Sequence, residues 1–464
     1  MSKLIRILLF SFLSLSILVS CKKKGNTVTP NIILILVDNL GLNDLHFLNG
    51  RFPSPNLDKL SEKSVVFDLA YTASSISKAS RASIFSGQHP VRHGIYESDS
   101  VTYGPTFAKK LIAVKSKISL DVKCVTIAGI LAQKGYSTAN IGKWGISEDP
   151  LNFGFTFNAG GSDALVTNSF SPPFQLKNLA ENASCENLDD RLTNESLDFI
   201  NKNSNKPYFL TLSFYSVNPP LEPKPDHLKM LKDKFDEDEP IRLNYAAAVF
   251  NIDWNIGRLV DFLEKENYTE NTVIIFCSTN GAINSIAGQT PLRGGNGSYY
   301  EGGIRIPFFI YLPQKLTSVG HNPYLVSTLD IFPTILDICG IENKNNALYL
   351  DGISLLETIK KNEDHGRDSL FWHFPVYTPA IHPDKDGGRD PYFQTRPGSA
   401  VLSNNWKLFK YFECGSIELY DLKTDPGEKT NLVKQNPEKT EQMLQMLNRW
   451  QKKSHAPIPF PKDF

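Results

Sequence analysis

The sequence predicts an α/β protein: a large α/β sandwich around a mostly parallel central sheet, followed by a smaller C-terminal α+β subdomain. Apolar runs suited to central strands alternate with helical segments up to about residue 365. This alternation is typical of parallel sheets that are covered by helices on both faces. Beyond that point the runs are shorter and turn residues separate them, which predicts a second, smaller sheet.

The expected elements follow from local patterns. Residues 32–37 form an uninterrupted apolar run, as in a strand that is buried on both faces. Apolar side chains at helical spacing over residues 245–263 predict a helix with one broad buried face. The other expected elements are a helix at 126–134 closed by Gly135, strands at 139–141, 208–214 and 273–277, C-terminal strands at 400–402, 406–411 and 417–422, and a helix that starts at Asn436 and Pro437.

Length and composition predict two units and exclude one class of partner. A chain of 464 residues can bury a substantial core in each of two units, expected at 31–365 and 366–464. Lys plus Arg and Asp plus Glu both number 49, so no net charge attracts nucleic acid, which is not expected as a partner. The cysteines beyond Cys21 are widely spaced without a C-x-x-C pair, which argues against a zinc ribbon or a disulfide framework.

The N-terminus has the pattern of a bacterial lipoprotein signal. Basic residues precede an apolar run at 7–19, which is too short to span a bilayer comfortably. The run ends in Leu-Val-Ser-Cys, which resembles a lipobox, so we expect a signal peptide at 1–21 and lipidation of Cys21. Residues 22–30 would then tether an exported, membrane-anchored protein that faces the periplasm or the cell surface. A cleaved signal with a chance cysteine is the alternative.

A set of ordered motifs carries a resemblance to a known family. The most specific motif is Ser-Lys-Ala-Ser-Arg at residues 77–81, and Pro-Val-Arg-His-Gly follows at 90–94. Further matching segments are 135–139 with 142–144, 271–274 with 280–281, 293–295 with 300–307, and 418–422 with 425–428. From residue 30 to about 455, the chain resembles the sulfatases, which belong to the alkaline-phosphatase-like superfamily.

The resemblance implies a sulfuric ester hydrolase that acts on sulfated glycans or aryl sulfates. Such a reaction needs a nucleophile, a cation for the sulfate oxygens and an acid for the leaving alcohol. By resemblance, Ser77 could be oxidised to formylglycine as the nucleophile, and Arg81 and Lys143 would lie beside it in the catalytic site. The other implied positions are a calcium site at Asp38, Asn39, Thr279 and Asn280, and substrate contacts at Lys143, Asn218, Asn296 and His373.

Several of these positions depart from the family's pattern. Asn39 and Thr279 stand where the resemblance implies calcium-binding aspartates. Gly145 and Asn218 replace histidines, and Asn296 replaces a lysine. With one carboxylate left of three, the calcium affinity should fall steeply. Loss of a general acid or base typically lowers the reaction rate by a factor of about 10² to 10⁴, so we expect sulfatase activity to be weak or lost.

Three functions remain open from the sequence. The first is a sulfatase with an atypical metal site, and the second is a pseudosulfatase whose Arg81 and Lys143 hold a sulfated glycan or another small anionic ligand without turnover. The third uses unmodified Ser77 in a phosphatase-like reaction, although the His-rich two-zinc ligand set for that chemistry is not apparent. Ser77 could also be a helix N-terminal serine. His373 and His382 either reach over the pocket or have a structural role.

Overall fold

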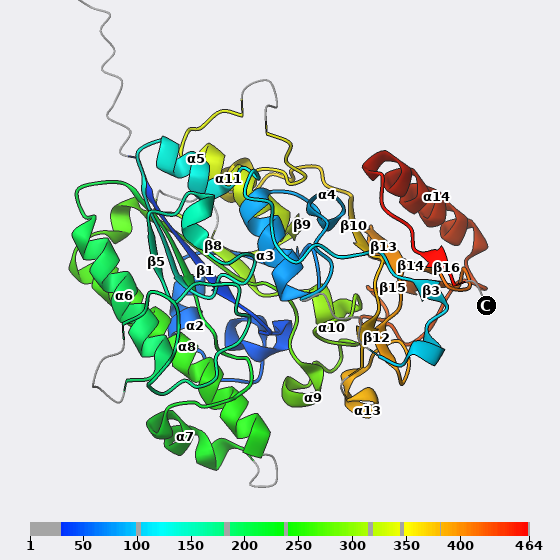
Figure 1. Ribbon diagram of the computed structural model, residues 1–464, viewed down its shortest axis with the longest axis horizontal. Helices are drawn as coiled ribbons and strands as arrows, with labels where there is room; N and C mark the ends of the chain where they lie inside the picture. The colour runs from blue at the N-terminus through cyan, green and yellow to red at the C-terminus, as the bar shows by residue number, and fades with distance from the viewer. Residues whose placement is uncertain are drawn as a thin grey trace, which may run out of the picture.

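The computed structural model describes residues 29–98, 104–180, 186–235, 240–313, 319–343, 348–380 and 382–462 (Figure 1). The expected signal peptide, Cys21 and most of the expected tether lie outside the described residues. Among the helices of the described ranges, none combines the length and the apolar character needed to cross a membrane. Four cysteines in these ranges are free thiols: Cys124, Cys277, Cys339 and Cys414.

A sheet of eight strands forms the centre of the larger part of the protein. Its order is β5-β4-β6-β1-β7-β8-β2-β9, and only β8 runs antiparallel to its neighbours. The strands are β1 (Asn31–Val37), β2 (Val65–Tyr71), β4 (Ser137–Gly142), β5 (Phe157–Ala159), β6 (Tyr208–Ser213), β7 (Thr272–Ser278), β8 (Phe308–Tyr311) and β9 (Gly320–Ser327). The expected fold class, with its mostly parallel central sheet, is confirmed.

Helices cover both faces of this sheet (Figure 1). Successive side chains of a strand point to opposite faces, so Ile33 and Ile35 of β1 join one hydrophobic core, and Ile32 and Leu34 join another. The first core is completed by α2 (Pro55–Ser61), α6 (Leu188–Lys202) and α8 (Pro240–Lys265). The second is completed by α3 (Ser77–Ser86), α5 (Ile127–Gln133) and α11 (Ile331–Ile338).

The C-terminal part contains an antiparallel sheet in the order β10-β13-β14-β15. Its strands are β10 (Ser369–Phe374), β13 (Gly398–Ser403), β14 (Trp406–Tyr411) and β15 (Ile417–Asp421). Helix α14 (Pro437–Ser454) packs on one face through Met443 and Leu447, and the other face packs against residues of the larger part such as Tyr71 and Tyr300. Two ribbons complete it, β11 (Thr378–Pro379) with β12 (Phe393–Thr395) and β3 (Leu111–Ile112) with β16 (Phe460–Pro461).

The elements expected from the sequence are present, with small shifts at their ends. Thr126 caps α5 by accepting a hydrogen bond from the backbone N–H of Gly129, and Asn436 with Pro437 begins α14 as expected. Strands β2, β8, β9 and β10 and helix α6 were not predicted. Shorter helices are α4 (Pro90–His93), α7 (Pro225–Leu231), α9 (Asn284–Ala287), α10 (Glu301–Ile304), α12 (Leu356–Lys361) and α13 (Pro383–Asp386).

A buried charge cluster joins the two sheets. Lys407 Nζ of β14 lies 3.0 Å from Glu301 Oε1 and 3.0 Å from Glu428 Oε1, and all three side chains are buried. The Tyr71 hydroxyl donates a hydrogen bond of 2.9 Å to Glu301. Two carboxylates thus share one lysine. Burial and the neighbouring charge of Glu301 outweigh the attraction of Lys407 and raise the pKa of Glu428 to about 7.

This raised pKa predicts that stability falls as the pH rises. Glu428 starts from an ordinary pKa of 4.5 in the unfolded chain, so between about pH 4.5 and 7 the folded state binds the extra proton. The stabilisation is fully present below this pH range and is lost as the pH rises through it. The free energy of unfolding then falls by at most ~1.4 kcal/mol per pH unit. Glu428→Gln should remove this residue's contribution to the slope, measured by urea unfolding at several pH values. An unchanged slope in the variant would contradict the assignment.

Candidate functional site

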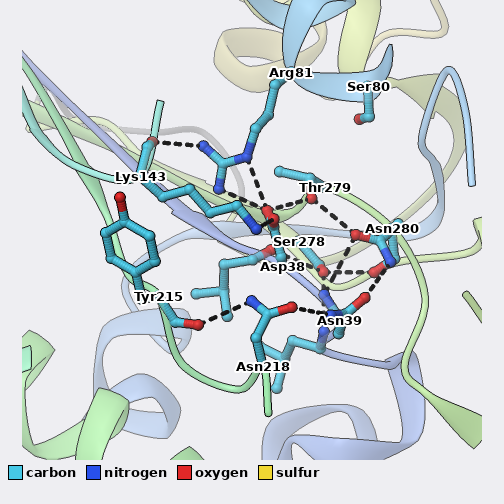
Figure 2. A network of polar contacts seen from close by, with 12 residues as sticks. Asp38, Asn39, Ser80, Arg81, Lys143, Tyr215, Asn218, Ser278, Thr279 and Asn280 are labelled. Carbon is cyan, nitrogen blue, oxygen red and sulfur yellow. Dashed lines mark hydrogen bonds and ion pairs between the residues drawn. The ribbon is translucent and has the colours of Figure 1, made fainter. Parts of the chain in front are cut away.

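Four neighbouring parallel strands, β4, β6, β1 and β7, end at the same edge of the central sheet, and polar side chains gather there (Figure 2). This edge is where ligands bind in open α/β sheets. The structure brings together eight of the positions singled out from the sequence, namely Asp38, Asn39, Arg81, Lys143, Asn218, Thr279, Asn280 and Asn296.

Asp38 is the centre of a buried ion-pair cluster. Arg81 donates hydrogen bonds to Asp38 Oδ1 from Nε at 3.0 Å and from Nη2 at 2.6 Å. Lys143 Nζ lies 2.5 Å from the other carboxylate oxygen, Oδ2. Figure 2 shows Arg81 reaching Asp38 from helix α3 above and Lys143 reaching it from the left. The Thr279 hydroxyl adds a hydrogen bond of 2.6 Å to Asp38 Oδ1, so protein groups neutralise both oxygens.

The neighbouring charges in this cluster shift the pKa values of Asp38 and Lys143. Burial alone would raise the pKa of Asp38, but the charges and hydrogen bonds of Arg81 and Lys143 outweigh burial and hold that pKa well below its usual range. Burial lowers the pKa of Lys143, although Asp38 opposes the shift. Asp38 is therefore ionised at neutral pH, and two cations face one anion inside the protein.

Beside the ion pairs, side-chain amides form a hydrogen-bonded network. Asn39 Oδ1 accepts hydrogen bonds from Asn280 Nδ2 at 2.7 Å and from Asn296 Nδ2 at 2.5 Å. Asn39 Nδ2 donates to Asn218 Oδ1 at 2.5 Å, and Asn218 Nδ2 donates to the carbonyl of Tyr215 at 2.9 Å. Asn39 adopts a left-handed backbone conformation, with φ of 59°, which asparagine tolerates better than most residues.

These side chains do not fit a calcium ion in this arrangement. Calcium binds about six to eight oxygens, and its affinity follows the charge and number of those ligands. Asp38 is the one carboxylate of the cluster and already faces two cations, while the oxygen of Asn39 accepts two hydrogen bonds. Within the described ranges, no group of three or more His, Cys, Asp or Glu side chains is placed to hold a metal ion.

The space that a side chain at position 145 would enter is filled by a hydrophobic residue. A Cβ atom added to Gly145 would lie 2.8 Å from Leu165 Cδ2, and 3.9 Å from both Arg81 Cδ and Lys143 Cε. Gly145 also has a positive φ of 77°, which L side chains rarely adopt. The position where the resemblance implies a histidine is thus adapted to glycine, with Leu165 beside it.

Ser77 is the first residue of helix α3 and follows Ile76, which lines a pocket. Its side chain is half-buried, whereas the helix residues after it are buried. Ile76 is the N-cap and forms no side-chain capping hydrogen bond, and Ser77 follows it as the first helical residue, so the expectation of a helix N-terminal serine is met. This pocket has a volume of about 380 Å³ and is lined by Ile76 and Asn296 together with residues such as Asn284, Tyr377 and Gln394.

The two histidines considered from the sequence have different surroundings. His373 is buried, and its ring nitrogens lie 2.7 Å from Ser399 Oγ and 2.8 Å from the carbonyl of Pro457. Burial lowers the pKa of His373 to about 4. The structure therefore does not bring His373 to the strand-end cluster, and its contacts are those of a structural residue. His382 precedes helix α13, which contributes Asp386 to the pocket.

Sequence reasoning missed the pocket residues of the C-terminal part. Tyr377 and Gln394 belong to the β11–β12 region, far along the chain from Ser77 and Asn296. Turn residues around these short strands indicate a ribbon, but nothing local indicates that the ribbon faces the edge of the central sheet. That information lies in the packing of one sheet against the other.

Comparisons with known proteins agree with this architecture. The family model described as Sulfatase matches residues 30–341, and that described as N-sulphoglucosamine sulphohydrolase, C-terminal, matches residues 297–455. A protein named Sulfatase from Formosa agariphila is 27% identical, over 100% of this chain and 98% of its own length.

Solved structures are similar over nearly the whole chain. The crystal structure of Ps i-CgsB in complex with k-i-k-neocarrahexaose has a TM-score of 0.75 and 26% identity, covering 94% of this chain and 95% of the other. The structure of BT4656 in complex with its substrate D-glucosamine-2-N,6-O-disulfate has a TM-score of 0.73 and 19% identity, covering 94% and 100%, and shows likeness of fold.

Proposed function

The chain belongs to the sulfatase family, and we propose that it binds a sulfated glycan in the pocket lined by Ile76 and Asn296 while hydrolysing sulfate esters weakly or not at all. The observation that carries this proposal is the engagement of Asp38 by Arg81 and Lys143. A carboxylate that is neutralised by protein cations is a poor ligand for a divalent cation. Without a cation, the charge that develops on the sulfate oxygens is not stabilised by a Lewis acid.

The strand-end cluster, which reaches the pocket through Asn296, carries an excess of positive charge. Asp38, Arg81 and Lys143 together carry a net charge of +1 at the edge of the sheet, in a region that is nearly excluded from water. Electrostatic attraction is stronger in such surroundings than in water. Ps i-CgsB and BT4656 are described in complex with an oligosaccharide and with a sulfated sugar, which supports a sulfated glycan as the ligand here.

The proposal predicts that calcium has no effect on the purified soluble protein. Calorimetry with micromolar calcium should give no binding heat, and the melting temperature should be equal in calcium and in chelator. A bound ligand at 100 times its Kd would stabilise the fold by about 2.7 kcal/mol, which a melting experiment detects readily. A calcium-dependent shift would contradict the proposal and would favour the metal-dependent hydrolase. A calcium-binding sulfatase of the family measured alongside serves as the positive control.

An active sulfatase is the second candidate, and the position of Ser77 favours it. Ser77 starts α3 directly after Ile76 of the pocket and is more exposed than the residues that follow it in the helix. If a serine-specific maturase oxidises it, the peptide that contains residues 77–81 loses two hydrogen atoms. Mass spectrometry of the protein from its native host measures this directly. A fully unmodified peptide rules out the formylglycine mechanism.

We also propose that Cys21 is lipidated and anchors the exported protein to a membrane. Asn271 Nδ2 donates a hydrogen bond of 3.1 Å to the carbonyl of Thr29, at the amino end of β1. The seven residues of β1 span about 23 Å to the functional edge. Thr29 therefore lies at the end of β1 opposite to the functional edge. Cys21→Ala should abolish incorporation of radiolabelled palmitate, and retained label would refute the anchor.

A further inference from the structure

A two-stranded ribbon forms one wall of the pocket beside Asn296. Pro379 of β11 and Gln394 of β12 both line the pocket. Just beyond Pro379, the backbone N–H of Ala380 donates a hydrogen bond of 3.1 Å to the carbonyl of Tyr392. Tyr392 therefore sits at the end of the pocket wall, two residues from Gln394, or about 7 Å along an extended strand.

Two exposed aromatic side chains lie together at this end of the wall. Phe107 is 81% exposed and Tyr392 is 46% exposed. Their ring centroids are 5.6 Å apart, and the rings are nearly perpendicular. The segment before Phe107 is held against β12, because Gly104 packs so closely on the ring of Phe393 that an added Cβ would lie 2.6 Å from it. Both aromatic rings thus lie against the ribbon that supplies this wall of the pocket.

Exposed aromatic pairs of this kind suit a sugar ring better than a charged group. A sugar presents C–H groups on the faces of its ring, which pack on aromatic carbon, and hydroxyls at its edge, which the Tyr392 hydroxyl can meet. Contiguous exposed apolar side chains often mark a binding site. The carboxylates of Glu97 and Asp386 also line the pocket, and they disfavour a second sulfate in it.

We infer that Phe107 and Tyr392 form a platform for a sugar ring of an oligosaccharide whose sulfated unit lies at Asn296. This inference rests on the proposed function and deepens it, because it names a chain of several sugars, rather than a monosaccharide or an aryl sulfate, as the ligand class. Continuity of the aromatic pair with the pocket wall argues for the same molecule at both places.

The test compares short and long ligands on wild type and on the double variant Phe107→Ala/Tyr392→Ala. The probes are disaccharides and hexasaccharides from carrageenan, chondroitin sulfate, heparan sulfate and fucoidan, titrated by calorimetry. Truncating a pair of aromatic anchors should weaken binding by roughly tenfold or more. We expect wild type to bind at least one hexasaccharide that much more tightly than its disaccharide, and the double variant to lose this difference while keeping its disaccharide affinity.

Tyr349→Ala is the matched control, because Tyr349 is 58% exposed and does not line this pocket. It should bind both lengths as wild type does. Equal affinity of wild type for the two lengths, or unchanged hexasaccharide binding by the double variant, would overturn the platform and leave the proposed function standing. No binding of any sulfated saccharide by wild type would overturn both.

Discussion

Replacing Asp38 with asparagine is expected to lower the free energy of unfolding by about 3–5 kcal/mol, the range for breaking a buried ion pair by removing one partner. Asp38 and Arg81 have no exposed side-chain surface, and Lys143 has 2%. The variant would leave two cations in a nearly dry site without an anion. Urea unfolding at neutral pH measures the change, and a loss below about 1 kcal/mol would contradict the central role of Asp38.

Lys143→Met is the matched control for this prediction. It removes one of two cations and leaves the Arg81–Asp38 pair balanced, with the hydrocarbon volume largely kept. We therefore expect a much smaller loss than in Asp38→Asn, or none. If both variants lost the same amount of stability, the volume of the side chains rather than their charge would be decisive.

The pH dependence of Asp38→Asn gives a second readout. In wild type, burial lowers the pKa of Lys143, and the negative charge of Asp38 opposes this shift. Without Asp38, the pKa of Lys143 should fall further, so the unfolded chain would bind more protons than the folded one at alkaline pH. The stability of the variant should therefore rise as the pH increases toward the unfolded pKa of lysine.

The sequence predicted strands well where they are buried on both faces. Strands β1, β6 and β7 read as apolar runs because helices cover them on either side. Strand β9 lies at the edge of the sheet and contains Pro323, and its burial pattern is irregular, so local sequence gives no clear signal. Strand β2 includes Asp68, which is half-buried and interrupts the apolar pattern.

The site could be predicted only in part, because its contacts join residues that are distant in sequence. Motifs flanking the strand ends indicated which residues would meet, and the structure places Asp38, Asn39, Lys143 and Asn280 together. The motifs did not indicate that Lys143 would lie 2.5 Å from Asp38, because this contact depends on two strands 100 residues apart in sequence. The inward position of Leu165 beside Gly145 is likewise a matter of packing.

Restoring two carboxylates should convert this edge of the sheet into a calcium site. Asn39→Asp together with Thr279→Asp changes the net charge of the cluster from +1 to −1 and places three carboxylates around Asn280. Without calcium, the added charges repel one another in a buried region, and we expect a loss of stability of several kcal/mol. With calcium at about 100 times its Kd, about 2.7 kcal/mol should be regained, measured as a calcium-dependent rise in melting temperature.

The control variant Thr279→Asn with Asn39 unchanged alters the shape of the same position without adding charge, so it should show no response to calcium. A response in the double variant alone would mean that the fold still provides the geometry for a metal and that missing carboxylates are what exclude it. If the double variant folds and ignores calcium, the geometry itself has changed. Lys143 is then the group to examine, because its ammonium faces the Asp38 oxygen that a cation would need. Adding Lys143→Ala to the double variant separates the two explanations, since it frees that oxygen and changes no other ligand.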